Sequence, residues 1–308
     1  PICHIHGQMM TPLPIDMSLH PEVQDGLEGV VAFASEIAEP DRAGGALRYR
    51  GVDIEELVGH VPFEAVWGLL VDGAYRPGLP PAEQHPLSVR TGDARIDLQA
   101  SLAMLAQEWG FEETLDIEPD QVRADLARSS VMALSHVAQS ARGIGQPPVP
   151  QSEIDQCGSI SERFLTRWRG EADPAHVKAI DAYWISAAEH GMNASTFTAR
   201  VITSTGADVA AALSGAVGAL SGPLHGGAPS RVLDMLDGVA ELGNAETWVK
   251  QALDRGERLM GFGHRVYRAE DPRARVLRRT ARELDAPRFQ VAEELEKAAL
   301  AELHARKP

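Results

Sequence analysis

Basic residues are scarce in this chain of 308 residues. It has 29 lysines and arginines against 44 aspartates and glutamates, which leaves a formal net charge of −15 at pH 7. A protein whose main partner is a nucleic acid normally presents a basic surface, so this balance argues against nucleic-acid binding. It leaves room for a small anionic substrate, because a few local arginines can override a distant acidic field.

Cysteines and long apolar runs are also lacking. The chain has only Cys3 and Cys157, and no apolar run approaches the roughly 20 residues that a membrane-spanning helix needs. Two cysteines exclude a disulfide scaffold and favour a reducing compartment, so we expect a cytoplasmic protein with no membrane partner. No paired Cys or His spacing typical of a metal site occurs, and we expect no metal. Hydrophobic residues still make up 44% of the chain, which is enough for a sizeable core.

Apolar residues recur at helical spacing through most of the chain, and this predicts an all-α fold. One exception is the turn-rich segment 41–45, whose β-branched and aromatic flanks predict a small N-terminal β-hairpin. The expected helices lie within 53–72, where Pro62 separates two apolar stripes, and around Leu98–Trp109, Leu126–Val137 and Ile154–Trp168, and then over 175–190, 194–204, 207–220, 228–241, 246–256, 272–284 and 289–305.

The expected helix 207–220 consists largely of alanine, glycine and serine. Small side chains let two helices approach closely, whereas a solvent-exposed helix would carry more charge. We therefore expect this helix to be buried at a helix–helix contact, between two subunits.

Three histidines lie in distinctive settings: His190 in AAEHGMNASTFTAR, His225 in SGPLHGGAPSRVL and His264 in LMGFGHRVYRAEDPRAR. His225 precedes two glycines and a helical pattern that begins near Pro229. The dipole of that helix would disfavour a second proton on the imidazole. A neutral imidazole can donate a hydrogen bond to an oxygen that gains charge, and the glycines would let a ligand approach the backbone.

The same argument applies to His264, because Gly261 and Gly263 give the backbone of its loop conformational freedom. Arg273 comes directly after the helix-start signal Asp271-Pro272, so its guanidinium can be directed back towards the loop to hold a carboxylate. These residues indicate an anion-binding, histidine-based acid–base site in a helical protein. A turn or packing role for the histidines and a solvated face for the arginines stay open at this point.

Four segments resemble, in chain order, the signature segments of the citrate synthase family: ALRYRGVDIEEL (46–57), EHGMNASTFTAR (189–200), GPLHGGAP (222–229) and GFGHRVYRAEDPRA (261–274). The similarity runs from about Gly26 to the end and is greatest to short bacterial members of actinobacterial type. It implies a mainly helical homodimer with a large and a small domain and an active site between them. We accordingly expect an irregular arm at 1–25, a large helical domain at 26–224 and a small domain at 225–308.

The resemblance also implies an activity: condensation of acetyl-CoA with oxaloacetate to citrate and CoA, by enolisation, Claisen-type addition and thioester hydrolysis, with no cofactor. Two catalytic residues would be His225, which hydrogen-bonds the thioester carbonyl, and His264, which polarises the oxaloacetate ketone. His190 and Arg273 would bind the oxaloacetate carboxylates. The CoA chain would lie against Leu259, Met260, Gly261, Phe262 and Gly263.

The resemblance implies a third catalytic residue, an acidic side chain in a segment of the form Asn-Val-Asp/Glu-Phe, and we expect it beyond residue 308. Glu293, Glu294 and Glu296 belong to a charged helix, and we expect them to be solvated. Two alternatives therefore stay open. One is 2-methylcitrate synthase, which takes propionyl-CoA, and the other is a non-catalytic protein that binds CoA or a dicarboxylate.

Overall fold

The computed structural model describes the chain in five ranges: residues 32–41, 45–76, 78–227, 230–262 and 271–306. The chain divides into two compact units, Pro1–Ser35 and Glu36–Pro308, and the second contains every helix and strand described below. The expected arm at 1–25 lies outside the described residues. The expected division of the remaining chain at residue 225 stays a prediction.

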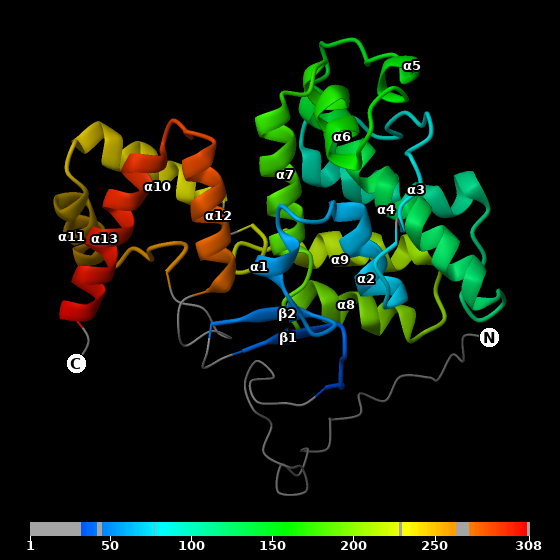
Figure 1. Cartoon of the computed structure of the whole chain (residues 1–308), viewed down its shortest axis with the longest axis horizontal. Coiled ribbons are helices and arrows are strands. Elements are labelled where there is room, and N and C mark those ends of the chain that lie inside the picture. Colours follow the sequence, from blue (N-terminus) through cyan, green and yellow to red (C-terminus); the bar gives the residue numbers. More distant parts are fainter. Residues whose placement is uncertain (1–31, 42–44, 77, 228–229, 263–270, 307–308) are drawn as a thin grey trace, which may run out of the picture. The chain divides into compact units, whose positions relative to one another are not determined.

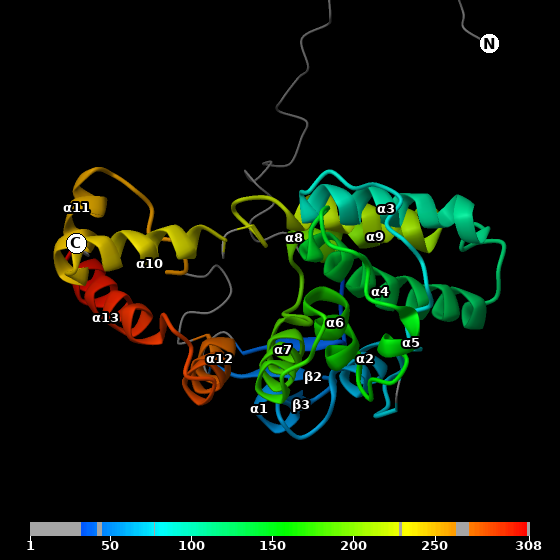
Figure 2. The same cartoon turned by 90° about the horizontal axis from the view of Figure 1, so that it is seen from above.

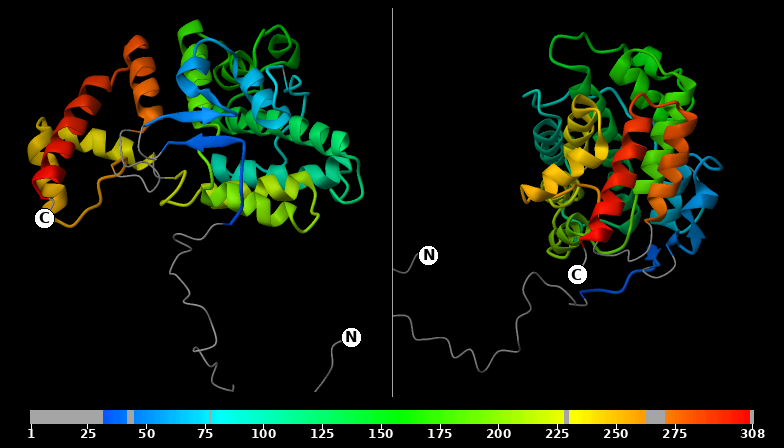
Figure 3. Two further views of the ribbon diagram at one scale, coloured as in Figure 1. Left: turned by 60° about the horizontal axis from the view of Figure 1, so that its bottom comes forward. Right: turned by 90° about the vertical axis from the view of Figure 1, so that its left-hand side faces the viewer.

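Three short strands form an antiparallel sheet. β1 (Ala38–Pro40) pairs with β2 (Leu47–Tyr49), with Ala38 opposite Tyr49 (Figure 3), and β2 pairs with β3 (Val52–Asp53). The expected hairpin is confirmed, and β3 is an addition that the sequence did not predict. Arg50 and Gly51 connect β2 to β3 with φ angles of 49° and 87°, the left-handed backbone of a tight hairpin turn. An Arg-Gly pair is an unusual choice for that turn, which is why the pattern did not show it.

Helices account for most of the described chain, so the all-α prediction with one small hairpin is confirmed (Figure 1). None of the described helices is long and apolar enough to cross a membrane. They are α1 (Ile54–Leu57), α2 (Phe63–Asp72), α3 (Ala94–Trp109), α4 (Pro119–Arg142), α5 (Gln151–Ile154), α6 (Ile160–Arg169), α7 (Pro174–Ala187), α8 (Ala194–Thr203), α9 (Val209–Leu220), α10 (Ser230–Leu242), α11 (Ala245–Asp254), α12 (Pro272–Glu283) and α13 (Phe289–Ala305).

The expected helix Ile154–Trp168 is wrong in one respect, because the structure divides it. Ile154 ends the short helix α5, and α6 begins after Ser159, whose hydroxyl accepts a hydrogen bond from the amide of Glu162. A serine N-cap satisfies an amide that has no partner within the helix. Ile154 and Ile160 are both buried, so apolar spacing alone could not show the break between them.

The core consists of several apolar clusters. One joins the sheet to α1, α2, α7 and α12 and includes Tyr49, Ile54 and Val276. Another is built from α10, α11 and α13, which pack on one another, together with the segment after α11 (Figure 1). The second cluster thus gives the C-terminal helices an apolar core of their own.

Helix α9 packs against α3 and α8 of the same chain, and Figure 2 shows α9 beside α3. Gly215 faces Ile202 of α8, and Gly218 faces Gln99 of α3, where a Cβ would lie 2.8 Å from the amide nitrogen. Except for Leu220, the residues of α9 are buried or half-buried. Burial at a helix–helix contact is therefore confirmed within the chain, and a contact between subunits stays a prediction.

Gly215→Leu is expected to destabilise the protein by about 1–3 kcal/mol, the usual effect of overpacking. The new side chain would compete with Ile202 for the same space, so α8 and α9 would have to separate. Urea unfolding measures the change. Gly145→Leu is the matched control, because a Cβ at Gly145 meets nothing within 4 Å. Equal stability of the two variants would contradict the packing described for α9.

Candidate active site

The link between α7 and α8, residues 188–193, carries His190. Oε1 of Glu189 accepts hydrogen bonds from the amides of His190 (2.8 Å) and Gly191 (2.9 Å). Its other carboxylate oxygen lies 3.5 Å from the hydroxyl of Thr196 in the first turn of α8. Gly191 has a φ of 89°, a conformation that glycine adopts without strain. One acidic side chain thus holds the backbone of the link at His190, and the sequence analysis did not single it out.

His225 lies in the turn 221–227 and contacts the first turn of α8. Its Nε2 is 2.9 Å from the hydroxyl of Ser195 and 3.4 Å from the backbone nitrogen of Ser195, which donates to it. The same hydroxyl lies 2.8 Å from Oδ1 of Asn193, the N-cap of α8, so its single proton is shared between Asn193 and Nε2, while the backbone amide of Ser195 makes Nε2 an acceptor. A neutral ring that accepts a hydrogen bond at Nε2 carries its proton on Nδ1. Among the described residues Nδ1 has no partner, so it is the atom through which His225 can donate to a ligand.

Burial lowers the pKa of His225 below its usual 6.5, so the imidazole is neutral near pH 7. A neutral ring is also what the sequence predicts, there from a helix dipole. Helix α10 begins at Ser230, and residues 228–229 lie outside the described ranges. Burial is therefore the cause that the structure supports.

The two glycines after His225 have a packing role. A Cβ on Gly226 would lie 2.7 Å from the carbonyl oxygen of Leu220, and one on Gly227 would lie 2.6 Å from that of Ser221. The turn is therefore too tight for a side chain at either position. Close contact within the turn explains these glycines, which the sequence analysis had assigned to the approach of a ligand.

Arg273 stands in the first turn of α12, where its guanidinium donates hydrogen bonds to both carboxylate oxygens of the N-cap Asp271, the shortest being 2.7 Å. This bidentate pair fixes the direction of the guanidinium. The expected neighbour His264 lies outside the described residues, as does Gly263. A contact between Arg273 and the His264 loop stays a prediction.

A cavity of about 280 Å³ lies beside the segment expected to contact CoA. Met260, Gly261 and Phe262 line it, whereas Leu259 is buried in the core of α10, α11 and α13. The remaining lining comes from three helices: Val232 and Leu236 of α10, Arg278 and Ala281 of α12, and Phe289, Ala292, Glu293, Leu295 and Glu296 of α13. Three of the five predicted CoA contacts thus border one mainly apolar hollow.

The three glutamates of α13 differ in environment. Glu293 and Glu294 are exposed, as expected. Glu296 is half-buried and pairs with Arg278 at 2.6 Å, so its description as simply solvated is wrong. Glu293 also pairs with an arginine of α12, Arg282 at 3.0 Å, so Glu296 differs from it in burial and not in being paired.

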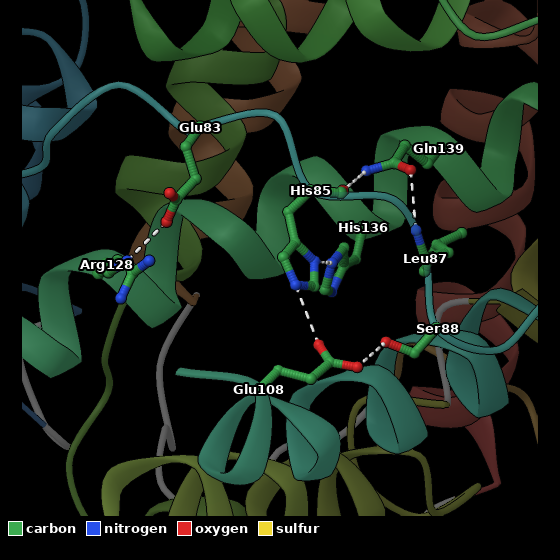
Figure 4. A network of polar contacts seen from close by, with 8 residues as sticks. All are labelled: Glu83, His85, Leu87, Ser88, Glu108, Arg128, His136 and Gln139. Atoms are coloured by element: carbon green, nitrogen blue, oxygen red, sulfur yellow. Dashed lines mark hydrogen bonds and ion pairs between the residues drawn. The ribbon is translucent and has the colours of Figure 1, made fainter. Parts of the chain in front are cut away.

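A second polar cluster joins the loop before α3 to α3 and α4 (Figure 4). Nδ1 of His85 lies 3.3 Å from Nε2 of His136, and Nε2 of His85 lies 3.0 Å from Glu108. Gln139 accepts from the amide of Leu87 and donates to the carbonyl of His85. This cluster leaves no local signal in the sequence, because His85 and His136 are 51 positions apart.

Burial, together with the nearby His85 and Arg167, lowers the pKa of His136 to about 3. Its side chain is fully buried, and its Nδ1 has no hydrogen-bond partner within the described part of the chain. An unpaired acceptor is less costly than an unpaired N–H, so the proton belongs on Nε2 and is donated to His85. His136 therefore stays neutral in the folded protein.

This buried histidine is expected to make the fold sensitive to acid. The unfolded chain takes up a proton near pH 6.5 and the folded chain only near pH 3, so stability falls as pH falls between these values. The loss is roughly 1.4 kcal/mol per pH unit, and His136→Gln should remove it. Urea unfolding between pH 6.5 and 4.5 measures the slope, with the exposed His60→Gln as control. Equal slopes in both variants would contradict the prediction. Three half-buried carboxylates also have raised pKa values: Glu64, Asp181 and Glu189. They contribute equally to the slope in both variants, so their effect cancels when the two slopes are compared.

No cluster of three or more His, Cys, Asp or Glu that could hold a metal occurs among the described residues. The described part of the chain holds a neutral histidine, His225, a second histidine on a fixed link, His190, and a carboxylate-paired arginine, Arg273. In a helical fold, these are the kinds of group that the expected anion-binding, histidine-based site requires.

Comparison with known proteins gives the family. The family model described as "Citrate synthase, C-terminal domain" matches residues 26–308, so the chain belongs to the citrate synthase family and is an enzyme of that type. It is 68% identical to "Putative citrate synthase 2" of Mycobacterium tuberculosis, covering 92% of this chain and 76% of that protein. It is 34% identical to the citrate synthase of Synechocystis (89% and 74% covered) and 34% identical to the 2-methylcitrate synthase of M. tuberculosis (84% and 69%).

Solved structures agree with the fold. A ternary complex of the Thermoplasma acidophilum citrate synthase with carboxymethyl coenzyme A and oxaloacetate matches with a TM-score of 0.79 and 25% identity, over 92% of this chain and 80% of that one. The citrate synthase of Thermotoga maritima matches with a TM-score of 0.70 and 29% identity, over 91% and 79%. The helical architecture is therefore that of citrate synthases.

Proposed function

We propose that this protein condenses acetyl-CoA with oxaloacetate to give citrate and CoA. The observation that carries the proposal is the neutral His225, whose ring is oriented by Ser195 at 2.9 Å. A related protein, the T. acidophilum enzyme, binds a CoA analogue together with oxaloacetate. The same ligand classes suit a site with a neutral hydrogen-bond donor and a carboxylate-binding arginine.

In this proposal the Nδ1 proton of His225 stabilises the thioester oxygen of acetyl-CoA as it gains charge during enolisation. A neutral imidazole suits this step, because Nδ1 donates a hydrogen bond to the oxygen while the lone pair of Nε2 is engaged by Ser195. His264 polarises the oxaloacetate ketone, while His190 and Arg273 hold the carboxylates. The acidic residue that removes the methyl proton is the one expected beyond residue 308.

We further propose that the protein is a homodimer and that it is located in the cytoplasm. The low cysteine content supports a reducing compartment. Light scattering tests the oligomeric state, and we expect a mass about twice the 33.2 kDa of the chain. A monomer at micromolar concentration would contradict this part of the proposal.

A second candidate is 2-methylcitrate synthase, because relatives of both kinds are 34% identical to the chain. One methylene in the acyl group changes specificity by only roughly 1–3 kcal/mol. Thiol release with oxaloacetate is therefore measured for acetyl-CoA and propionyl-CoA, on a form of the protein that includes the expected acidic residue. We expect a higher kcat/KM for acetyl-CoA. A higher value for propionyl-CoA would favour the second candidate, and oxaloacetate binding without thiol release would indicate a non-catalytic protein.

A further inference from the structure

Glu189 makes an unusual set of contacts for an acidic residue beside a proposed substrate ligand. A single oxygen, Oε1, accepts from the amides of both His190 and Gly191, at 2.8 and 2.9 Å. The other oxygen faces the hydroxyl of Thr196 at 3.5 Å, in the helix that follows the link. The carboxylate therefore turns inward onto its own link.

The backbone of Glu189 is held from the opposite side by the sheet. Its amide donates to the hydroxyl of Tyr49 in β2 at 3.3 Å, and that hydroxyl donates to the carbonyl of Ile185 in α7 at 2.8 Å. Tyr49 is fully buried, so this anchor is rigid. The residue before His190 is thus fixed at its main chain by Tyr49 and at its side chain by the link itself.

We propose that Glu189 is a positioning residue, which holds the His190–Gly191 backbone by accepting both amides and so presents the imidazole of His190 to an oxaloacetate carboxylate. The inference rests on the proposed function, because it assumes that His190 binds this substrate. It assigns Glu189 no contact with the substrate.

The role requires an oxygen acceptor and does not require a negative charge. Burial raises the pKa of Glu189, while the two amides, Thr196 and the positive charge of Arg200 oppose the rise. The carbonyl oxygen of a protonated carboxyl group or of an amide can accept the same two hydrogen bonds. Glu189→Gln should therefore keep the two hydrogen bonds that hold the link, and Glu189→Ala should remove them.

The first measurement is hydrogen exchange of the amides of His190 and Gly191, followed by mass spectrometry on the folded protein. In Glu189→Ala both amides should exchange at least about 10-fold faster, because they lose their acceptor. In Glu189→Gln the exchange rates should stay within about 3-fold of the original protein. This measurement needs no substrate.

The second measurement is the affinity for oxaloacetate by calorimetry, together with steady-state kinetics. Displacing a positioned group by about 1 Å can weaken its action by up to about 100-fold. We expect Glu189→Ala to raise the Kd and KM for oxaloacetate at least about 10-fold and to leave the KM for acetyl-CoA within about 2-fold. Glu189→Gln should leave all three close to their original values at every pH tested.

Asp181 offers a matched control. It is a carboxylate of α7 whose pKa is also raised by burial, and it accepts from the amide of Phe63 and the hydroxyl of Ser161. Asp181→Ala should therefore lower stability without a selective effect on oxaloacetate. Equal effects of Asp181→Ala and Glu189→Ala on the Kd for oxaloacetate would overturn the positioning role.

The remaining outcomes also decide the question. Loss of oxaloacetate affinity in Glu189→Gln would show that the charge acts and would overturn the proposal, as would unchanged amide exchange in Glu189→Ala. If the original protein bound no oxaloacetate, the proposed function would fail. The exchange rates would still show whether Glu189 holds the link.

Discussion

Replacing His225 with alanine is expected to lower kcat at least about 100-fold, the range for losing a positioned hydrogen-bond donor at a developing charge. The ring is neutral through burial and is oriented by Ser195 at 2.9 Å, so Nδ1 is the donor that the variant lacks. Affinity for oxaloacetate should change less than about 3-fold, because His225 is assigned to the thioester. Thiol release and calorimetry measure the two effects.

Ser195→Ala is the control for that experiment. It keeps the imidazole of His225 and removes one of the two Ser195 groups that face Nε2, while the backbone amide at 3.4 Å remains. We expect a smaller loss of kcat, about 3- to 30-fold, because the ring is present and less firmly oriented. A His225→Ala variant that retains the original kcat would remove His225 from the mechanism. The sequence alone predicts a loss of similar size, at least about 100-fold, for His264→Ala.

Arg273→Leu is expected to weaken oxaloacetate binding by about 10- to 150-fold, which corresponds to about 1.5–3 kcal/mol for a lost charged hydrogen bond. The guanidinium is already oriented by Asp271 at 2.7 Å, so little conformational freedom is lost when a carboxylate binds. Binding of a CoA analogue should change much less. Calorimetry with oxaloacetate and with the CoA analogue measures the two affinities separately.

The matched control is Arg282→Leu, which removes an exposed arginine of the same helix that pairs with Glu293. Unfolding measurements on both variants account for any change in the stability of α12, since Arg273→Leu also leaves Asp271 without this partner. Should Arg273→Leu weaken both ligands equally, Arg273 would belong to the CoA phosphates or to the structure of α12.

The helices show how far local information reaches. Asp93, Asp173, Asp208 and Asp271 each accept hydrogen bonds from amides in the first turn of the helix that follows, so these helices begin where their sequences place a cap. The hairpin before Leu47 was predictable from an equally local signal, the turn-rich segment 41–45. β3 was not, because its turn has no residue pair typical of a hairpin.

In the candidate site, local sequence information was not sufficient. Glycines and a local motif made His190 and His225 visible in the sequence, and the family resemblance supplied their roles. Their supports, Glu189 and Ser195, gave no such signal. Glu189 stands beside His190 in the chain, but an acidic residue before a histidine is common. Whether its carboxylate turns back onto the link depends on the fold around it.

The sequence by itself determined the helical class, the absence of a basic surface, most helix boundaries and the family, because caps, periodicity and motif segments act over a few residues. Only the tertiary structure decided which side chains meet. Ser195 reaches His225 across 30 positions, Tyr49 reaches Ile185 across 136, and His85 reaches His136 across 51. Such contacts arise from the packing of whole helices, and the pKa shifts of His225 and His136 follow from the burial that this packing produces.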